Sequence, residues 1–176
     1  MSQVFATTGN DAEQLEMISQ IGAYLRAQNA TVACAESCTG GGLAYALTSV
    51  AGSSDWFEQS FTTYSNSAKQ SLLGVSQYTL EQHGAVSAQC VEEMARGVRE
   101  RSQAAVGLST SGIAGPGGGS VQKPVGTVWF AVADATQTRS VSHCFDGDRA
   151  QVRQQAIGYA LELLHHRLVE INSQAL

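Results

Sequence analysis

The segment ACAESCTGGG, residues 33–42, places a serine, a cysteine and a threonine directly before three glycines. Ser37 ends an apolar run, so its hydroxyl can point into a cleft as a nucleophile, and the amides after it can stabilise an oxyanion or a phosphate. A simpler interpretation is that Ser37 or Thr39 only caps a helix. One glycine-rich turn is a weak signal, so the spacing alone leaves both interpretations open.

A serine nucleophile needs a neighbouring base, and none of the four histidines is clearly placed to serve Ser37. Lysine is the alternative, because burial lowers its pKa and leaves a neutral amine that accepts a proton. The chain has only two lysines, and Lys69 lies where a predicted strand passes into a helix. Tyr64 can orient both groups through its hydroxyl. The alternatives are a solvated Lys69 and a Tyr64 that only packs in its strand.

Two arginines suggest an anion site. Arg149 and Arg153 are four residues apart, so they share one face of a predicted helix. Arg149 lies near the N-terminus of that helix, where a cation opposes the helix dipole. Bidentate binding of an anion explains this placement. A salt bridge with Asp146 or Asp148 explains it nearly as well.

Hydrophobic periodicity predicts the elements that position these residues. We expect helices over residues 11–28, 43–50, 66–74, 88–102 and 147–170, and strands over residues 31–37, 56–64, 104–112, 125–134 and 138–146. Strands that alternate with helices and then form one hairpin predict a three-layer α/β/α sandwich with a mixed, mostly parallel sheet. We expect a flexible tail over residues 1–10 and a single domain over residues 11–171.

Polar segments follow three of the predicted strands. In open α/β folds, ligands bind beyond the carboxyl ends of parallel strands, so these segments are expected to share one cleft. The third segment continues into a long loop rich in glycine, and such loops commonly serve a function. The candidate binding residues in these segments and at the start of the last helix are Thr39, Gly40, Gly41, Thr110, Ser111, Gly112, Gly115, Arg149 and Arg153.

Composition excludes several classes of function. The net charge is −5 and the ten basic residues are scattered, so no basic face is expected to bind nucleic acid. No apolar run reaches the roughly 18 residues of a membrane span, and the polar start lacks the pattern of a secretion signal, so we expect a cytoplasmic protein. The cysteines, expected as reduced thiols without a redox or metal role, are Cys34, Cys38, Cys90 and Cys144.

Several motifs together resemble one known family. The segments ACAESCTGG, YSNSAKQSLLGV, TSGIAGPGGG, KPVGTVWFAV and FDGDRAQVR, in this order, are similar to the C-terminal domain of competence-damage-inducible protein A, the CinA family. The resemblance covers about residues 15–168. It implies the same three-layer fold and an amidohydrolase that converts nicotinamide mononucleotide to nicotinic acid mononucleotide and ammonia in pyridine nucleotide salvage. It also implies that no metal or cofactor is needed.

The resemblance assigns roles to individual residues. It implies that Ser37 is the nucleophile, that Lys69 is the base and that Tyr64 assists them. It implies that Arg149 is the arginine of the family's GDR segment, and Arg153 is included as a second candidate. Which glycine-rich segment would bind the phosphate and which the oxyanion stays open.

Two other classes of function remain possible from the sequence. A noncatalytic domain that binds pyridine nucleotides or acts as a regulatory partner would use the same loops. A purely structural interaction domain would not explain three polar clusters at strand ends. The expected partners are a small nucleotide substrate and a second copy in a homodimer, although core packing explains the apolar faces of the first and last helices equally well.

Overall fold

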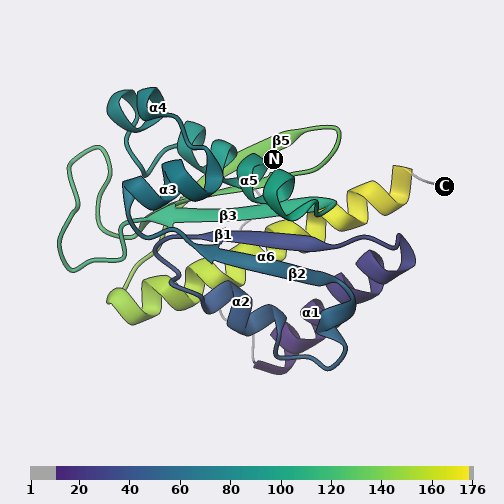
Figure 1. Cartoon of the computed structure of the whole chain (residues 1–176). Helices are drawn as coiled ribbons and strands as arrows, with labels where there is room; N and C mark the ends of the chain where they lie inside the picture. The colour runs from purple at the N-terminus through teal and green to yellow at the C-terminus, as the bar shows by residue number, and fades with distance from the viewer. Residues whose placement is uncertain (1–10, 175–176) are drawn as a thin grey trace.

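The structure, a computed structural model, describes residues 11–174 and contains one five-stranded sheet in the order β2-β1-β3-β4-β5 (Figure 1). The strands are β1 (Val32–Glu36), β2 (Phe57–Thr62), β3 (Val106–Gly112), β4 (Thr127–Ala133) and β5 (Thr138–Cys144). β1 pairs in parallel with β2 and β3, whereas β4 pairs antiparallel with β3 and β5. Only β4 therefore runs against the others, which confirms a mixed, mostly parallel sheet.

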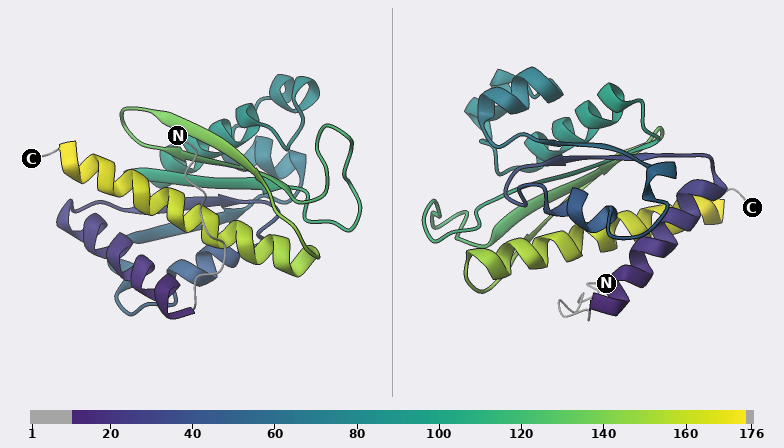
Figure 2. Two further views of the ribbon diagram at one scale, coloured as in Figure 1. Left: turned by 180° about the vertical axis from the view of Figure 1, so that it is seen from behind. Right: turned by 60° about the horizontal axis from the view of Figure 1, so that its bottom comes forward.

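Helices cover both faces of this sheet (Figures 1 and 2). One face carries α1 (Asp11–Ala27), α2 (Gly42–Leu47) and α6 (Arg149–Gln174), and the other carries α3 (Asn66–Leu73), α4 (Gln77–Gln82) and α5 (Ala88–Ser102). A short 3-10 helix, η1 (Ser53–Asp55), leads into β2. The three-layer α/β/α sandwich is thus confirmed. Within residues 11–174, no helix combines the length and the apolar character that a membrane crossing requires.

The elements differ from the predictions by more than two residues at three places. α2 ends at Leu47 rather than at residue 50, and α6 continues to Gln174, beyond the predicted domain end at residue 171. Periodicity does not predict α4, because one of its stabilising partners is distant in sequence: the Glu93 carboxylate on α5 accepts a hydrogen bond from the Ser76 amide at 2.7 Å. The predicted tail, residues 1–10, lies outside the described residues.

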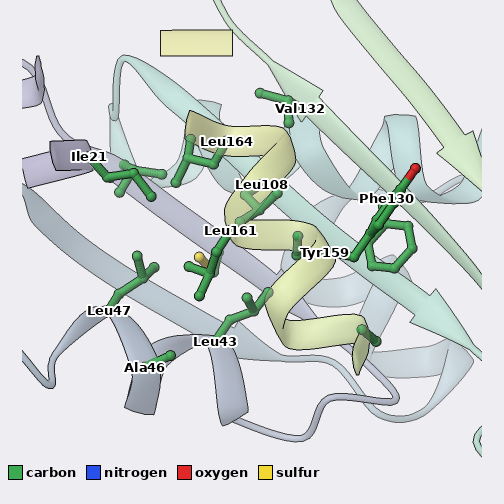
Figure 3. Packing of buried hydrophobic residues seen from close by; sticks show 14 of the residues in the cluster. Ile21, Leu43, Ala46, Leu47, Leu108, Phe130, Val132, Tyr159, Leu161 and Leu164 are labelled. Carbon is green, nitrogen blue, oxygen red and sulfur yellow. The ribbon is translucent and has the colours of Figure 1, made fainter. Parts of the chain in front are cut away.

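The main core lies between the sheet and the α1, α2 and α6 layer (Figure 3). Large apolar side chains of α6, such as Leu161 and Leu164, pack in the same cluster as Leu108 of β3 and Leu43 of α2. The periodicity of α6 supplies these residues, since positions three to four apart share a helix face. This core fixes α2 and α6, which lie beside the polar segments, against the sheet.

The opposite face of the sheet uses small residues, so α5 lies very close to it. A Cβ atom added to Gly107 of β3 would lie 2.1 Å from the Ala95 carbonyl oxygen of α5. A Cβ atom on Gly97 of α5 would lie 1.9 Å from the Leu73 carbonyl oxygen at the end of α3. Only glycine fits these approaches. Helix α5 thereby holds α3 at a fixed position over the sheet.

The carboxyl ends of the three parallel strands reach the same edge of the sheet. Glu36 at the end of β1 is paired with both Thr62 of β2 and Thr110 of β3. The chain segments that follow β1 and β2 therefore start next to each other, beside the end of β3. Figure 1 shows α3, the loop after β3 and the first turn of α6 at this end of the molecule.

Candidate active site

Ser37 is the first residue after β1 and lies in a turn that the sheet holds in place. Its amide donates a hydrogen bond to the Thr110 carbonyl of β3 at 3.0 Å, so strand pairing extends one residue beyond β1. Its own carbonyl accepts the Gly40 amide at 3.1 Å, which closes the turn. Gly40 and Gly41 have φ angles of 59° and 93°, a conformation that favours glycine. The structure thus places a largely buried Ser37 hydroxyl at the edge of the sheet.

Lys69 of α3 meets Ser37 directly. Its Nζ atom lies 3.0 Å from the Ser37 Oγ atom and donates a second hydrogen bond to the Thr63 carbonyl at 2.7 Å. The Lys69 side chain is only 1% exposed. Helix α3 starts where it does because the Ser65 hydroxyl caps it by accepting the Ala68 amide at 3.1 Å. The expected meeting of Ser37 and Lys69 is therefore what the structure shows.

The surroundings of Lys69 favour its neutral form. Burial lowers the pKa of the Lys69 amine, and the nearby thiols of Cys90 and Cys38 oppose this only in part. Within residues 11–174, no carboxylate forms an ion pair with Lys69. A neutral amine whose hydrogens face the Thr63 carbonyl can direct its lone pair toward the Ser37 hydroxyl.

Two threonines tie the serine turn to β3. The hydroxyls of Thr39 and Thr110 lie 2.8 Å apart, and both side chains are fully buried. Ser111 is also buried, and Gly112 packs so closely on β4 that an added Cβ atom would lie 2.8 Å from the Thr127 carbonyl oxygen. Of these candidates for substrate binding, Thr39 and Thr110 hold the turn in shape.

Arg153 also contacts the serine turn. Its guanidinium donates a hydrogen bond to the Thr39 carbonyl at 3.0 Å. A Cβ atom added to Gly40 would lie 3.2 Å from the same Nη2 atom. The first turns of α6 thus brace residues 39 and 40, and the arginine side chain lies beside the nucleophile.

Arg149 and Tyr64 form a second group at the same end of the sheet. The Arg149 guanidinium donates to the Gly115 carbonyl and to the Tyr64 hydroxyl, both at 2.9 Å. Asp148 caps α6 by accepting the amides of Ala150 and Gln151, so it does not pair with Arg149. Within the described residues, Arg149 forms no ion pair at all. The alternative prediction of a salt bridge between Arg149 and Asp146 or Asp148 is therefore wrong.

Tyr64 takes a different position from the one expected. Its side chain is 62% exposed, and its hydroxyl contacts Arg149 rather than Ser37 or Lys69. No local pattern indicates this contact, because it joins residues 85 positions apart. The hydroxyl of Tyr64 therefore belongs to the arginine group of the site.

Glu36 is a functional candidate that the sequence analysis missed. Its buried carboxylate accepts the amides of Gly41, Leu43 and Ala44, each at 3.0 Å, and the Ser60 hydroxyl at 3.1 Å. A glutamate directly before the serine turn is visible in the sequence. Its position in a buried strand, however, does not indicate that its side chain returns to the turn.

The contacts of Glu36 change which amides can meet an oxyanion. The amide of Gly40 is used within the turn and that of Gly41 by Glu36, so neither is free as the sequence suggested. Between residues 37 and 44, only the amides of Cys38 and Thr39 have no oxygen acceptor within the described part of the chain. Both amides directly follow Ser37, but Thr39 is fully buried, which leaves the Cys38 amide as the candidate donor.

The cysteines behave as ordinary buried or surface thiols. All four are free, and Cys34, Cys38 and Cys90 are buried. Burial raises the pKa of the Cys38 and Cys90 thiols to about 11. Between residues 11 and 174, no three side chains of His, Cys, Asp or Glu are grouped as a metal site requires. The expectation that the protein needs no metal stays a prediction.

Two cavities, of about 300 and 220 Å³, lie at the other end of the sheet and both border Arg167. There the Arg167 guanidinium donates to Asp134 at 2.7 Å, to Glu170 at 2.9 Å and to the Thr136 hydroxyl at 3.2 Å. The charged side chains Arg167, Asp134 and Glu170 therefore pair with one another. We place the candidate active site at Ser37 and Lys69 on chemical grounds rather than at these two cavities.

Comparison with known proteins identifies the family of this chain. The chain matches the family model described as the CinA C-terminal domain over residues 14–168. The nicotinamide-nucleotide amidohydrolase PncC of Escherichia coli K12 is 51% identical over 161 residues, which cover 91% of this chain and 98% of that protein. The protein of the same name from Enterobacter agglomerans is 55% identical over 148 residues, covering 84% of this chain and 90% of that protein.

A solved structure agrees with the fold. The competence damage-inducible protein A (ComA) from Klebsiella pneumoniae has a TM-score of 0.85 and 38% sequence identity, with 89% of this chain and 97% of that chain covered. The Ser37 turn, Lys69 and the arginines of α6 all fall within the residues that the family model matches. On the sequence match and the shared fold, this chain belongs to the CinA C-terminal domain family.

Proposed function

We propose that this chain is an amidohydrolase that converts nicotinamide mononucleotide to nicotinic acid mononucleotide and ammonia, and that it acts in pyridine nucleotide salvage. The observation that carries the proposal is the 3.0 Å contact between the Ser37 hydroxyl and the amine of a buried Lys69, which has no acidic partner within residues 11–174. The substrate class comes from the name of two relatives that this chain covers over nearly their whole length. Both are called nicotinamide-nucleotide amidohydrolase.

The first half of the reaction forms an acyl-enzyme. Neutral Lys69 accepts the proton of the Ser37 hydroxyl as the oxygen attacks the carboxamide carbon. Negative charge develops on the carboxamide oxygen, and the amide of Cys38 is the donor proposed to stabilise it. The carbon–nitrogen bond then breaks, and ammonia leaves with the proton that Lys69 had accepted.

The second half restores the enzyme. A water molecule attacks the acyl carbon while Lys69 accepts its proton, and the bond to the Ser37 oxygen breaks. Lys69 returns that proton to Ser37, and the carboxylic acid product leaves. The lysine therefore serves as base and acid in both halves, which requires a pKa that allows both forms near working pH.

The substrate's phosphate is proposed to bind at Arg149. Its guanidinium carries no carboxylate partner within the described residues, and it borders the glycine-rich loop through Gly115. The amides at the start of α2 are a poor alternative, because the Glu36 carboxylate already occupies them. The substrate would then lie with its carboxamide at Ser37 and its phosphate at Arg149.

The test is ammonia release from nicotinamide mononucleotide, with the acid product measured in parallel and with a chelator present in half of the samples. Ser37→Ala and Lys69→Ala should each nearly abolish turnover, since base assistance alone is worth about 10²-fold to 10⁴-fold. Normal turnover by either variant would refute its role. Saturable binding without ammonia release would instead support a noncatalytic pyridine-nucleotide-binding domain. The homodimer stays a prediction.

A further inference from the structure

We infer that Glu36 is the positioning residue of the active site, which holds the Ser37 turn in its reactive shape and leaves the Cys38 amide to meet the oxyanion. This inference deepens the proposed function and rests on it. Glu36 touches neither Lys69 nor Arg149 through any hydrogen bond, so its effect passes through the backbone of the turn.

The hydrogen bonds of Glu36 hold the turn at both ends. Its backbone carbonyl accepts the Thr63 amide at 2.8 Å, which joins the ends of β1 and β2. Its side chain reaches across to the Gly41 amide at 3.0 Å, where the turn passes into α2. Residues 37–40 therefore span two fixed points that belong to one residue. This arrangement limits how far the Ser37 hydroxyl can move from Lys69.

The carboxylate also accepts hydrogen bonds from several amides that would otherwise be available to bind an anion. One oxygen accepts the amides of Gly41 and Leu43, and the other accepts the Ala44 amide and the Ser60 hydroxyl. A carboxylate offers about four acceptor positions, so all of them are used. The buried charge has no cationic partner within residues 11–174, and these donors take that role. A bound phosphate at this place would meet a fixed negative charge.

As a consequence, some amides of the turn already have a hydrogen-bond acceptor and others do not. If Glu36 did not hold Gly41, the turn could rotate and present other amides to the substrate. With Glu36 in place, the donor is the amide of Cys38, because Thr39 also lacks an oxygen acceptor within the described residues but is fully buried. Catalysis by such donors depends on their being fixed before the charge develops.

The test replaces Glu36 with an isosteric neutral side chain. In Glu36→Gln, an NH₂ group replaces one of the two oxygens and cannot accept from a backbone amide, so the Ala44 amide or the amides of Gly41 and Leu43 lose their acceptor. A matched control is Glu93→Gln: that carboxylate also accepts an amide at a helix start, from Ser76 at 2.7 Å, but it forms no hydrogen bond with the serine turn. Both variants are checked for folding by circular dichroism and thermal melting.

Two readouts separate positioning from general destabilisation. We expect Glu36→Gln to lower kcat about 10²-fold with KM within about threefold, the size of effect that a misplaced group or a lost oxyanion donor has elsewhere. The second readout is the rate at which a fluorophosphonate labels Ser37. There the serine oxygen bonds to phosphorus, the P–F bond breaks, fluoride leaves and Lys69 accepts the proton. This rate should fall in parallel, whereas Glu93→Gln should keep both rates within about threefold.

If Glu36→Gln does not fold, Glu36→Asp keeps the charge but withdraws it by one methylene group, and kcat should fall about tenfold at unchanged KM. A folded Glu36 variant with wild-type kcat and labelling would overturn the inference while the amidase proposal stands, as would an equal loss in Glu93→Gln. Wild-type protein that releases no ammonia, but whose Ser37 labelling still depends on Glu36, would overturn the amidase proposal alone. A wild-type protein that neither reacts nor releases ammonia overturns both.

Discussion

Two buried cations at opposite ends of the sheet are held in opposite ways. Lys69 lies at the carboxyl end of the parallel strands, contacts a hydroxyl and a carbonyl, and has its pKa lowered by burial. Arg167 lies at the other end and donates to two carboxylates, and its pKa is raised chiefly by the hydrogen bond to Asp134. Burial alone therefore does not identify a catalytic cation. The absence of a carboxylate within the described residues separates the reactive lysine from the structural arginine.

The largest expected effect comes from making Lys69 resemble Arg167 in charge. Lys69→Arg places beside Ser37 a cation that cannot lose its proton, so kcat should fall by about 10²-fold to 10⁴-fold. The matched control is Lys123→Arg, since Lys123 is the chain's other lysine and only donates to the His83 carbonyl at 2.9 Å. Ammonia release measures both. Turnover by Lys69→Arg within tenfold of wild type would remove the lysine from the mechanism.

The second prediction concerns stability at the other end. Arg167→Met leaves the buried Asp134 carboxylate without its cation and should lower the free energy of unfolding by about 3–5 kcal/mol, measured by urea denaturation. Turnover per folded molecule should stay unchanged. Adding Asp134→Leu to Arg167→Met should recover most of the loss, because no lone charge then remains buried. A loss below about 1 kcal/mol would mean that the pair contributes little.

The two ends should also respond to pH at opposite limits. Burial raises the pKa of Asp134, but the hydrogen bonds from Arg167, Thr136 and Gln137 outweigh it and bring the pKa to about 2, from 3.8 in an unfolded chain. The folded state therefore gains about 2 kcal/mol above pH 4, and this gain is lost as pH falls toward 2. Comparison of Asp134→Asn with wild type in acid tests it: the difference in unfolding free energy should shrink over that range.

For Lys69 the sign is the same, but the pH range is alkaline. Its folded pKa lies below 10.5, so between the two values the unfolded chain binds more protons and the free energy of unfolding rises with pH. Relative to Lys69→Met, wild type should thus gain stability as pH rises toward about 10.5. A difference between the two proteins that stays constant over this range would contradict the lowered pKa.

The smallest expected effect is that of Tyr64→Phe, which removes one exposed hydrogen bond to Arg149. Such a bond is worth about 1 kcal/mol, so KM should change by up to about fivefold while kcat stays within about threefold. Steady-state kinetics with nicotinamide mononucleotide separate the two constants. If kcat instead fell by about two orders of magnitude, Tyr64 would return to the assisting role in proton transfer that the sequence suggested.

Local patterns were enough to predict most of the fold. The strands and the longer helices follow from periodicity, because side chains that face one core repeat at the period of the element. Helix α4 was not predicted, because the Glu93 carboxylate, on a different helix, stabilises its start. The pairing of Ser37 with Lys69 could be expected because both follow parallel strands.

The finer arrangement of the site could not be predicted from local patterns. Nothing about Glu36 in a buried strand indicates that its carboxylate turns back to bind amides, and the Tyr64–Arg149 contact joins the end of β2 to the start of α6. Both contacts depend on how separate elements meet in space. Sequence motifs therefore located the reactive groups better than the residues that hold them.

Thr63 joins the machinery of the site to the sheet itself. Its amide donates to the Glu36 carbonyl and its carbonyl accepts from Lys69, so a single residue links β1 to the Lys69 amine. The spacing between Ser37 and Lys69 is thus inherited from the pitch between neighbouring strands, not from the glycine-rich loop after β3. Insertions or exchanges in that loop should therefore leave the separation of Ser37 and Lys69 unchanged.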